Sequence, residues 1–89
     1  MIKIVKAKYL KDHTVRLYFS DGSMADYDFS YLLDKKTVLT DALKNIDFFK
    51  DFFLELGAIG WKNGLEFSPD SLYRKAKESG KLQAAEEAA

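Results

Sequence analysis

Two aspartates and one glutamate are the side chains in this sequence most suited to chemistry. Asp26 and Asp28 fall on one face of a predicted strand, where they could hold Mg²⁺ if a phosphate or further oxygen ligands completed the site. The same residues also have folding roles, because Asp26 can pair with Arg16 across the sheet and Asp28 can cap a helical turn. We favour the folding roles. An alternative hypothesis is a small enzyme that uses acidic residues, and its candidate residues are these two carboxylates and Glu66.

The stretch GWKNGLEF, residues 60–67, suggests a second kind of site. Trp61 and Asn63 could line a ligand pocket, because an aromatic ring beside an amide is a common recognition pair. Alternatively, Trp61 packs in the core and the Asn63-Gly64 pair supplies the positive φ of a tight turn, which is the interpretation we favour. The candidate ligand or partner residues of the chain are therefore Trp61, Asn63, Glu66, Asp26 and Asp28.

The single histidine is a poor candidate for a general base. No Ser or Cys nucleophile stands in a recognisable motif, and a hairpin loop seldom shifts a pKa. We expect His13 to be a solvated turn residue. With one His and no Cys, the chain cannot build a disulfide, a thiolate nucleophile or a multi-histidine metal site by itself. No catalytic residue, metal or cofactor is predicted.

Four phenylalanines recur at helical spacing, and they are Phe48, Phe49, Phe52 and Phe53. On a helix they would form a wide apolar stripe, which is typical of a core-facing side. A small sheet could leave part of such a stripe uncovered. The uncovered part would then serve as a self-association patch.

Charge is balanced in total but not along the chain. Fourteen basic and fourteen acidic side chains give a formal net charge of zero. A dedicated nucleic-acid binder normally carries a basic excess, so nucleic acid is not the expected partner. A solvated sheet face explains the basic N-terminal set, and a weak nucleic-acid binder that contacts phosphates through this set is an alternative hypothesis. This set is Lys3, Lys6, Lys8, Lys11 and Arg16.

The first three segments predict an antiparallel meander, because apolar residues alternate in each. A loop of residues 20–22 with a left-handed Gly22 pairs Leu17 with Ala25, and it also sets Arg16 opposite Asp26. A loop of residues 11–13 completes the first hairpin. There we expect His13 in the left-handed position.

Helices and a second hairpin are expected after the meander. Residues 28–36 predict a short helical turn, and residues 38–51 predict one or two short helices with Asn45 or Asp47 as a cap. Their inward apolar residues would be Val38, Leu39, Leu43, Ile46, Phe49 and Phe53. Residues 52–57 could continue a helix or form a strand and turn. Strands over 58–61 and 65–67 follow, and Ser68 and Pro69 start a C-terminal helix that Gly80 ends.

These motifs together resemble the DUF2442 family, a small bacterial domain of unknown function. The shared pattern has an apolar-Phe-x-Asp-Gly hairpin, a Phe-Phe segment and a closing Trp-x-Asn-Gly series, although Asp26 replaces a usual apolar residue. The residues that fit are Phe19, Asp21, Gly22, Asp28, Phe48, Phe49, Trp61, Asn63, Gly64, Glu66, Pro69, Asp70, Leu72 and Tyr73. The resemblance implies an α+β fold but no established activity. Some longer relatives append a helix-turn-helix segment, and since this chain ends sooner we do not expect DNA binding to transfer.

The sequence as a whole predicts one α+β domain over residues 1–78 and a flexible tail over residues 79–89. Its fold would be a twisted antiparallel sheet, made of the meander and a C-terminal hairpin, with short helices on one face and a C-terminal helix. We expect a non-catalytic interaction module whose partner is a second copy or a small protein. The resemblance makes a regulatory or antitoxin-like role conceivable. No apolar run is long enough for a membrane span, and a cytoplasmic location is expected.

Overall fold

The computed structural model describes residues 1–85 and confirms the α+β class. The strands are β1 (Ile4–Lys11), β2 (Thr14–Phe19), β3 (Ser23–Asp28), β4 (Phe53–Glu55), β5 (Ala58–Gly60), β6 (Glu66–Phe67) and β7 (Gln83–Ala84). The α-helices are α1 (Val38–Asp41), α2 (Ile46–Lys50) and α3 (Pro69–Glu78), and the 3-10 helices are η1 (Ser30–Asp34) and η2 (Ala42–Lys44).

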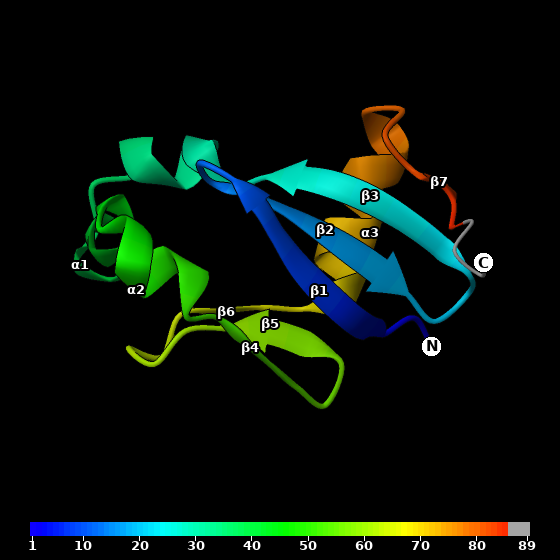
Figure 1. Ribbon diagram of the computed structural model, residues 1–89, viewed down its shortest axis with the longest axis horizontal. Helices are drawn as coiled ribbons and strands as arrows, with labels where there is room; N and C mark the ends of the chain where they lie inside the picture. Colours follow the sequence, from blue (N-terminus) through cyan, green and yellow to red (C-terminus); the bar gives the residue numbers. More distant parts are fainter. Residues whose placement is uncertain (86–89) are drawn as a thin grey trace.

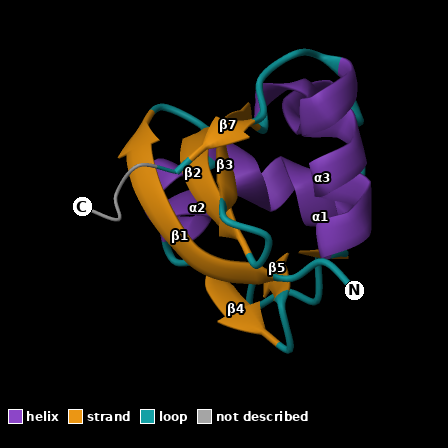
Figure 2. Cartoon of the chain, turned by 90° about the vertical axis from the view of Figure 1, so that its right-hand side faces the viewer, coloured by secondary structure: helices purple, strands orange, loops and turns teal. Residues whose placement is uncertain are grey.

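The strands form two antiparallel sheets. The large sheet has the order β1-β2-β3-β7, and the small sheet has the order β4-β5-β6. Helix α3 lies behind the large sheet, α1 and α2 lie at one end, and the small sheet lies below (Figures 1 and 2). The C-terminal hairpin, β5 and β6, therefore forms a separate sheet with β4. The sequence instead predicts this hairpin in one sheet with the meander.

The meander has the predicted register. Leu17 pairs with Ala25 and Arg16 with Asp26, and Gly22 takes a φ of +88° in the second turn. This register holds because it keeps Val15 and Leu17 on the buried face, whereas a shift of one residue would place an Asp there.

The first turn differs from the prediction in one residue. Lys11 pairs with Thr14, so the loop contains only two residues and the left-handed one is Asp12, with a φ of 49°. The prediction that His13 takes this conformation is wrong. A register shift between Tyr9 and Lys11 moves the turn by one position, and Asp tolerates the left-handed region well.

Side-chain caps fix the helix starts that the sequence predicts. The Asn45 side chain accepts hydrogen bonds from the backbone N–H groups of Asp47 and Phe48 at the start of α2. Ser68 accepts from Ser71 N–H at the start of α3. The expected inward stripe from residue 38 to 53 is only partly correct: Leu43 and Phe49 are buried, whereas Val38, Leu39, Ile46 and Phe53 are exposed. Phe53 leaves the stripe because α2 ends at Lys50 and residue 53 begins β4.

The core lies between the large sheet, α3 and the small sheet. It contains the inward residues of β2 and β3, together with Leu72 and Ala76 from α3. Phe29, Phe49 and Trp61 fill its centre, and their ring centroids lie 5.7 to 6.0 Å apart.

The last described residues extend the large sheet. Gln83 pairs with Met24, Ala84 pairs with Ser23, and Ala85 N–H donates to Gly22 O at 2.9 Å. Strand β7 lies in the segment 79–89 that is predicted from the sequence to be a flexible tail, and the flexibility of this segment stays a prediction. Residues 86–89 of the segment lie outside the described residues. No helix among residues 1–85 is long and apolar enough to cross a membrane.

Candidate functional site

Trp61 is a core residue. Its side chain is 1% exposed, and its indole N–H donates to the Phe49 carbonyl oxygen at 2.8 Å. The Phe49 ring stacks on it at 5.7 Å, and Phe29 meets it edge-on. The preferred interpretation of Trp61 is therefore confirmed, and the ring is not free to receive a ligand.

Asn63 connects the β5–β6 turn to α1. Its side-chain amide donates to the Leu39 carbonyl oxygen at 3.1 Å, and its Oδ1 accepts from Leu65 N–H at 3.2 Å. Gly64 takes a φ of +97°, as the turn requires. Both polar ends of Asn63 thus stabilise the fold.

This geometry predicts different costs for two substitutions of Asn63. Asn63→Ala removes both hydrogen bonds and should lower the free energy of unfolding by about 1–2 kcal/mol. Asn63→Asp keeps the acceptor for Leu65 N–H but turns a carboxylate oxygen toward the Leu39 carbonyl oxygen, so at neutral pH it should cost more than Asn63→Ala. Urea denaturation of both variants measures the difference, and equal stability of Asn63→Ala and the unsubstituted protein would contradict this role.

Asp26 and Asp28 have the folding roles that the sequence favours. The Arg16 guanidinium donates to both carboxylate oxygens of Asp26, at 2.7 and 3.1 Å. Arg16 alternates along β2 with buried apolar residues, so it lies on the opposite face of the large sheet. Asp28 accepts from the backbone N–H of Ser30 at 2.9 Å. No group of three or more His, Cys, Asp or Glu that could hold a metal ion occurs within residues 1–85.

The two aspartates also line one small cleft of about 180 Å³ at the edge of β3. Tyr27 and Tyr31 form its wall, and Lys75 lies over the Tyr31 ring at 5.3 Å. Glu66 does not belong to this cleft, so the three candidate carboxylates do not converge.

His13 is not the solvated residue that the sequence predicts. It is half-buried, its Nε2–H donates to the Leu43 carbonyl oxygen at 2.7 Å, and its ring centroid lies 4.6 Å from that of Phe49. The histidine therefore ties the first turn to η2, a contact between residues distant in sequence.

Glu66 lies on the outer side of the small sheet. Leu54, Ile59 and Phe67 pair across this sheet and pack on the core, so the alternate residues point away from it. No described helix or strand covers that lower side (Figure 1). We call this surface, with the β4–β5 turn beside it, the hairpin face; its residues are Phe53, Glu55, Leu56 and Glu66.

The hairpin face is exposed and partly apolar. Phe53 is 42% exposed and Leu56 is 92% exposed. Phe53, Glu55 and Glu66 line a shallow hollow of about 120 Å³ above Gly60. The core residue Trp61 also lines this hollow, so two of the predicted site residues, Trp61 and Glu66, meet there.

Leu56 occupies a conformation that disfavours it. Leu56 and Gly57 are the two central residues of the β4–β5 turn and have φ values of 53° and 85°. Positive φ at both positions defines a type I′ turn, which prefers Asn-Gly or Asp-Gly. A leucine in the left-handed region is strained, and here it is also almost fully exposed.

The hairpin tip is held against the start of β1. Ile4 N–H donates to Gly57 O at 2.9 Å, and Gly57 lies directly over Lys3. Next to this contact, Val5 is 61% exposed. The tip is therefore fixed in place although its leucine has no partner within the described chain.

Comparison with known proteins gives one match. The DUF2442 family, described as a protein of unknown function, matches residues 4–78. The chain belongs to the DUF2442 family. No curated protein and no solved structure matches the chain.

The matched region of this DUF2442 domain includes the whole hairpin face. The sequence pattern identified Glu66, and it named Phe53 as part of a phenylalanine stripe that could leave a self-association patch, but it missed Glu55 and Leu56. The signal that could have found them is the unfavourable Leu-Gly turn, which can be recognised only once residues 52–57 are known to form a hairpin.

Three aspartates should make the stability of the DUF2442 domain sensitive to acid. Ser23 hydrogen bonds lower the pKa of Asp21, the Arg16 hydrogen bonds lower the pKa of Asp26, and the Ser30 backbone N–H lowers the pKa of Asp28. A carboxylate with a lowered folded-state pKa stabilises the fold above its unfolded pKa of about 4, and this contribution is lost as the pH falls through the folded value.

The unfolding temperature should therefore decrease progressively below about pH 4. Thermal unfolding followed by circular dichroism from about pH 7 to about pH 2 measures this decrease. Asp21 also accepts a 2.7 Å hydrogen bond from Tyr73 on α3. Asp21→Asn should therefore make the decrease of the unfolding temperature below about pH 4 less steep. An unfolding temperature that does not change across this range would contradict the prediction.

Proposed function

We propose that the chain is a non-catalytic interaction module and that the hairpin face binds another protein. The observation that carries the proposal is Leu56, which is 92% exposed in a left-handed conformation. Proteins break local rules of this kind chiefly at functional sites. A leucine that stabilises neither the turn nor the core has its best explanation in a contact outside the chain.

The surroundings of Leu56 support the same proposal. Phe53 is exposed on the same hairpin, and exposed aromatic and aliphatic groups that lie together are typical of binding surfaces. The hairpin tip is anchored to β1 through the Ile4–Gly57 hydrogen bond, so the binding surface would be rigid before the partner arrives.

The carboxylates give no comparable support to an enzyme. Asp26 and Asp28 are engaged by Arg16 and by the Ser30 backbone, and Glu66 lines a different hollow. The proposed partner is a small protein, and the pair would have a regulatory, antitoxin-like role. The proposed location is the bacterial cytoplasm.

If Leu56 serves binding, replacing it should increase the stability of the fold and weaken binding of the partner. Leu56→Asn supplies the residue that a type I′ turn prefers and should raise the free energy of unfolding by about 1 kcal/mol. Urea denaturation checks this value. A destabilised Leu56→Asn protein would show that the leucine supports the fold and would remove the main argument for a binding role.

Co-purification tests the binding role. The unsubstituted protein, Leu56→Asn and Val38→Asn are tagged and expressed in cells that contain the natural partner. Val38 is the matched control, because it is 87% exposed on α1, which lies at the left of Figure 1 and apart from the β4–β5 turn. A protein recovered with the unsubstituted chain and with Val38→Asn, but lost with Leu56→Asn, is the expected result. Equal recovery with all three variants would contradict the proposal.

A further inference from the structure

We infer that the hairpin face docks a partner surface on which a lysine or arginine side chain stands beside an apolar one. The inference rests on the proposed function and adds the chemistry of the partner. It follows from the charge of the small sheet, from the shape of its hollow and from the position of the chain's own basic residues.

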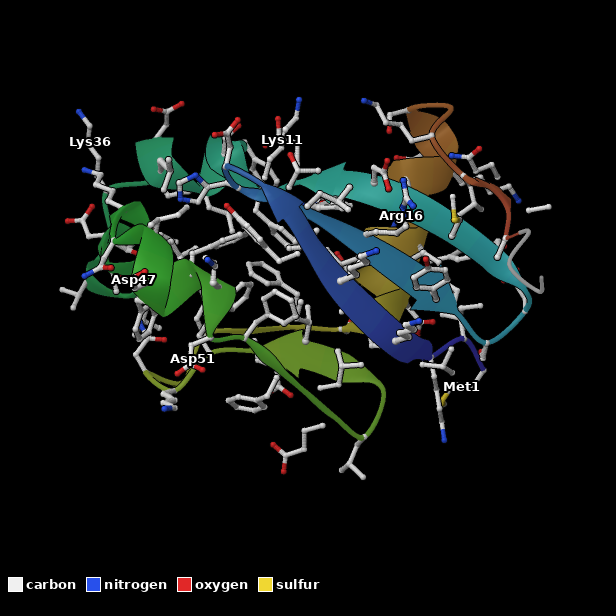
Figure 3. All side chains as sticks on the ribbon, viewed as in Figure 1. Met1, Lys11, Arg16, Lys36, Asp47 and Asp51 are labelled. Atoms are coloured by element: carbon white, nitrogen blue, oxygen red, sulfur yellow. The ribbon has the colours of Figure 1, made fainter. Side chains whose placement is uncertain are left out.

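The small sheet carries charge of one sign only. Its three strands read FLE, AIG and EF, so their charged residues are Glu55 and Glu66, and no strand contributes a Lys or Arg. The adjacent Lys62 is 2.9 Å from Asp51, which lies beside the start of β4 (Figure 3). Within residues 1–85 no ion pair involves Glu55 or Glu66, although the whole chain has a net charge of zero.

The hollow suits a cationic side chain. Glu55 and Glu66 line it together with the ring of Phe53, and its volume is about 120 Å³. Gly60 forms the floor, and a Cβ atom there would lie 3.6 Å from the Phe53 ring and 3.3 Å from Leu65 O. Carboxylates beside an exposed aromatic ring attract an ammonium or guanidinium group through both ion pairing and the cation–π interaction.

Leu56 provides the apolar half of the surface. It follows Glu55 at the tip of the hairpin, so a partner that places a cation near Glu55 must cover Leu56 with its neighbouring side chains. Burial of this leucine supplies affinity, while the carboxylates select the partner's charge and orientation.

A second copy of the chain is a poorer fit. A two-fold dimer that laid one hairpin face on the other would bring two acidic surfaces together, which is unfavourable. The chain's basic strand residues belong to β1 and β2 of the large sheet, and they include Lys6, Lys8 and Arg16. None of these basic residues belongs to the hairpin face itself, so a different basic protein is the partner we infer.

Panning of a random peptide display library tests this chemistry without knowledge of the partner. The targets are the purified unsubstituted protein and the charge-reversed variant Glu55→Lys/Glu66→Lys. The unsubstituted protein should enrich peptides that combine Lys or Arg with apolar residues. A synthetic copy of the best peptide should bind the charge-reversed variant at least about tenfold more weakly, and binding should weaken as salt is added.

A second reversal keeps the test specific. Asp34→Lys/Glu78→Lys changes the net charge by the same amount at two exposed sites, in η1 and at the end of α3, and should leave the enriched peptides unchanged. Phe53→Ser should weaken the peptide without altering its preference for basic residues. Enrichment of no basic motif, or of one that binds the Glu55→Lys/Glu66→Lys protein equally well, overturns the inference. If co-purification still recovered a partner that depends on Leu56, the proposed function would stand. Only the inferred basic character of the partner would be wrong.

Discussion

Trp61→Ala should lower the free energy of unfolding by about 3–5 kcal/mol, the range for removing a large aromatic side chain from a core. Trp61 is 1% exposed and touches rings from three parts of the chain, namely Phe29, Phe49 and Phe67. Small domains are stabilised by only about 5–15 kcal/mol, so the variant should lose much of its stability margin. Urea denaturation followed by far-UV circular dichroism measures the loss, because the substitution removes the chain's one tryptophan fluorophore.

Trp61→Phe separates packing from hydrogen bonding. It keeps an aromatic ring and removes the indole N–H that donates to Phe49 O, so it should cost about 1–3 kcal/mol. A Trp61→Ala protein within about 1 kcal/mol of the unsubstituted chain would show that Trp61 is dispensable for the core, and a ligand role would then regain support.

Gly57→Ala should be the most damaging of the glycine substitutions in the turns, at about 2–4 kcal/mol. Gly57 has a φ of +85°, which a residue with a Cβ adopts at a cost. A Cβ at this position would also lie 2.8 Å from both Cβ and Cγ of Lys3, so either the tip or β1 must move. Thermal and urea unfolding of the variant measure the loss.

Gly22→Ala is the matched control. Gly22 has nearly the same φ, +88°, and a Cβ there would meet no atom within 4 Å, so its cost should be the backbone strain alone, about 1 kcal/mol. In a Lys3→Gly background, the cost of Gly57→Ala should fall toward that of Gly22→Ala. Equal costs of Gly57→Ala and Gly22→Ala in the unsubstituted background would contradict the close contact between the hairpin tip and β1.

The meander could be predicted because its side chains leave a single satisfactory register. Pairing Leu17 with Ala25 keeps the apolar residues together and sets Arg16 against Asp26, and both pairs occur. The Asn63-Gly64 turn and the Ser68 cap could also be predicted from the sequence, because each depends on local backbone chemistry.

The hairpin face could not be predicted because its position depends on contacts distant in sequence. The run FFLELGAIGW lacks the alternation that distinguishes a strand from a helix, and Leu-Gly is not a usual turn signal. The exposure of Phe53 follows from the end of α2 at Lys50 and from the pairing of β4 with β5, which no local pattern shows. His13 was misplaced for the same reason, since its partner is the carbonyl group of Leu43.

The surface that best supports a function thus lies where local preference and the fold disagree. A leucine is held in a left-handed turn, exposed to solvent, on a sheet whose charged strand residues are both glutamates. The remaining candidate residues, Trp61, Asn63, Asp26 and Asp28, are explained by packing, hydrogen bonds or caps.

Site-specific photo-crosslinking is the most direct test of the hairpin face as a binding surface. Benzoylphenylalanine is incorporated in place of Leu56, or in place of Val38 as the equally exposed control, and the cells are irradiated while the partner is present. We predict a defined protein adduct from position 56 that mass spectrometry identifies and that position 38 does not give. No adduct from position 56, or the same adducts from both positions, would contradict the account.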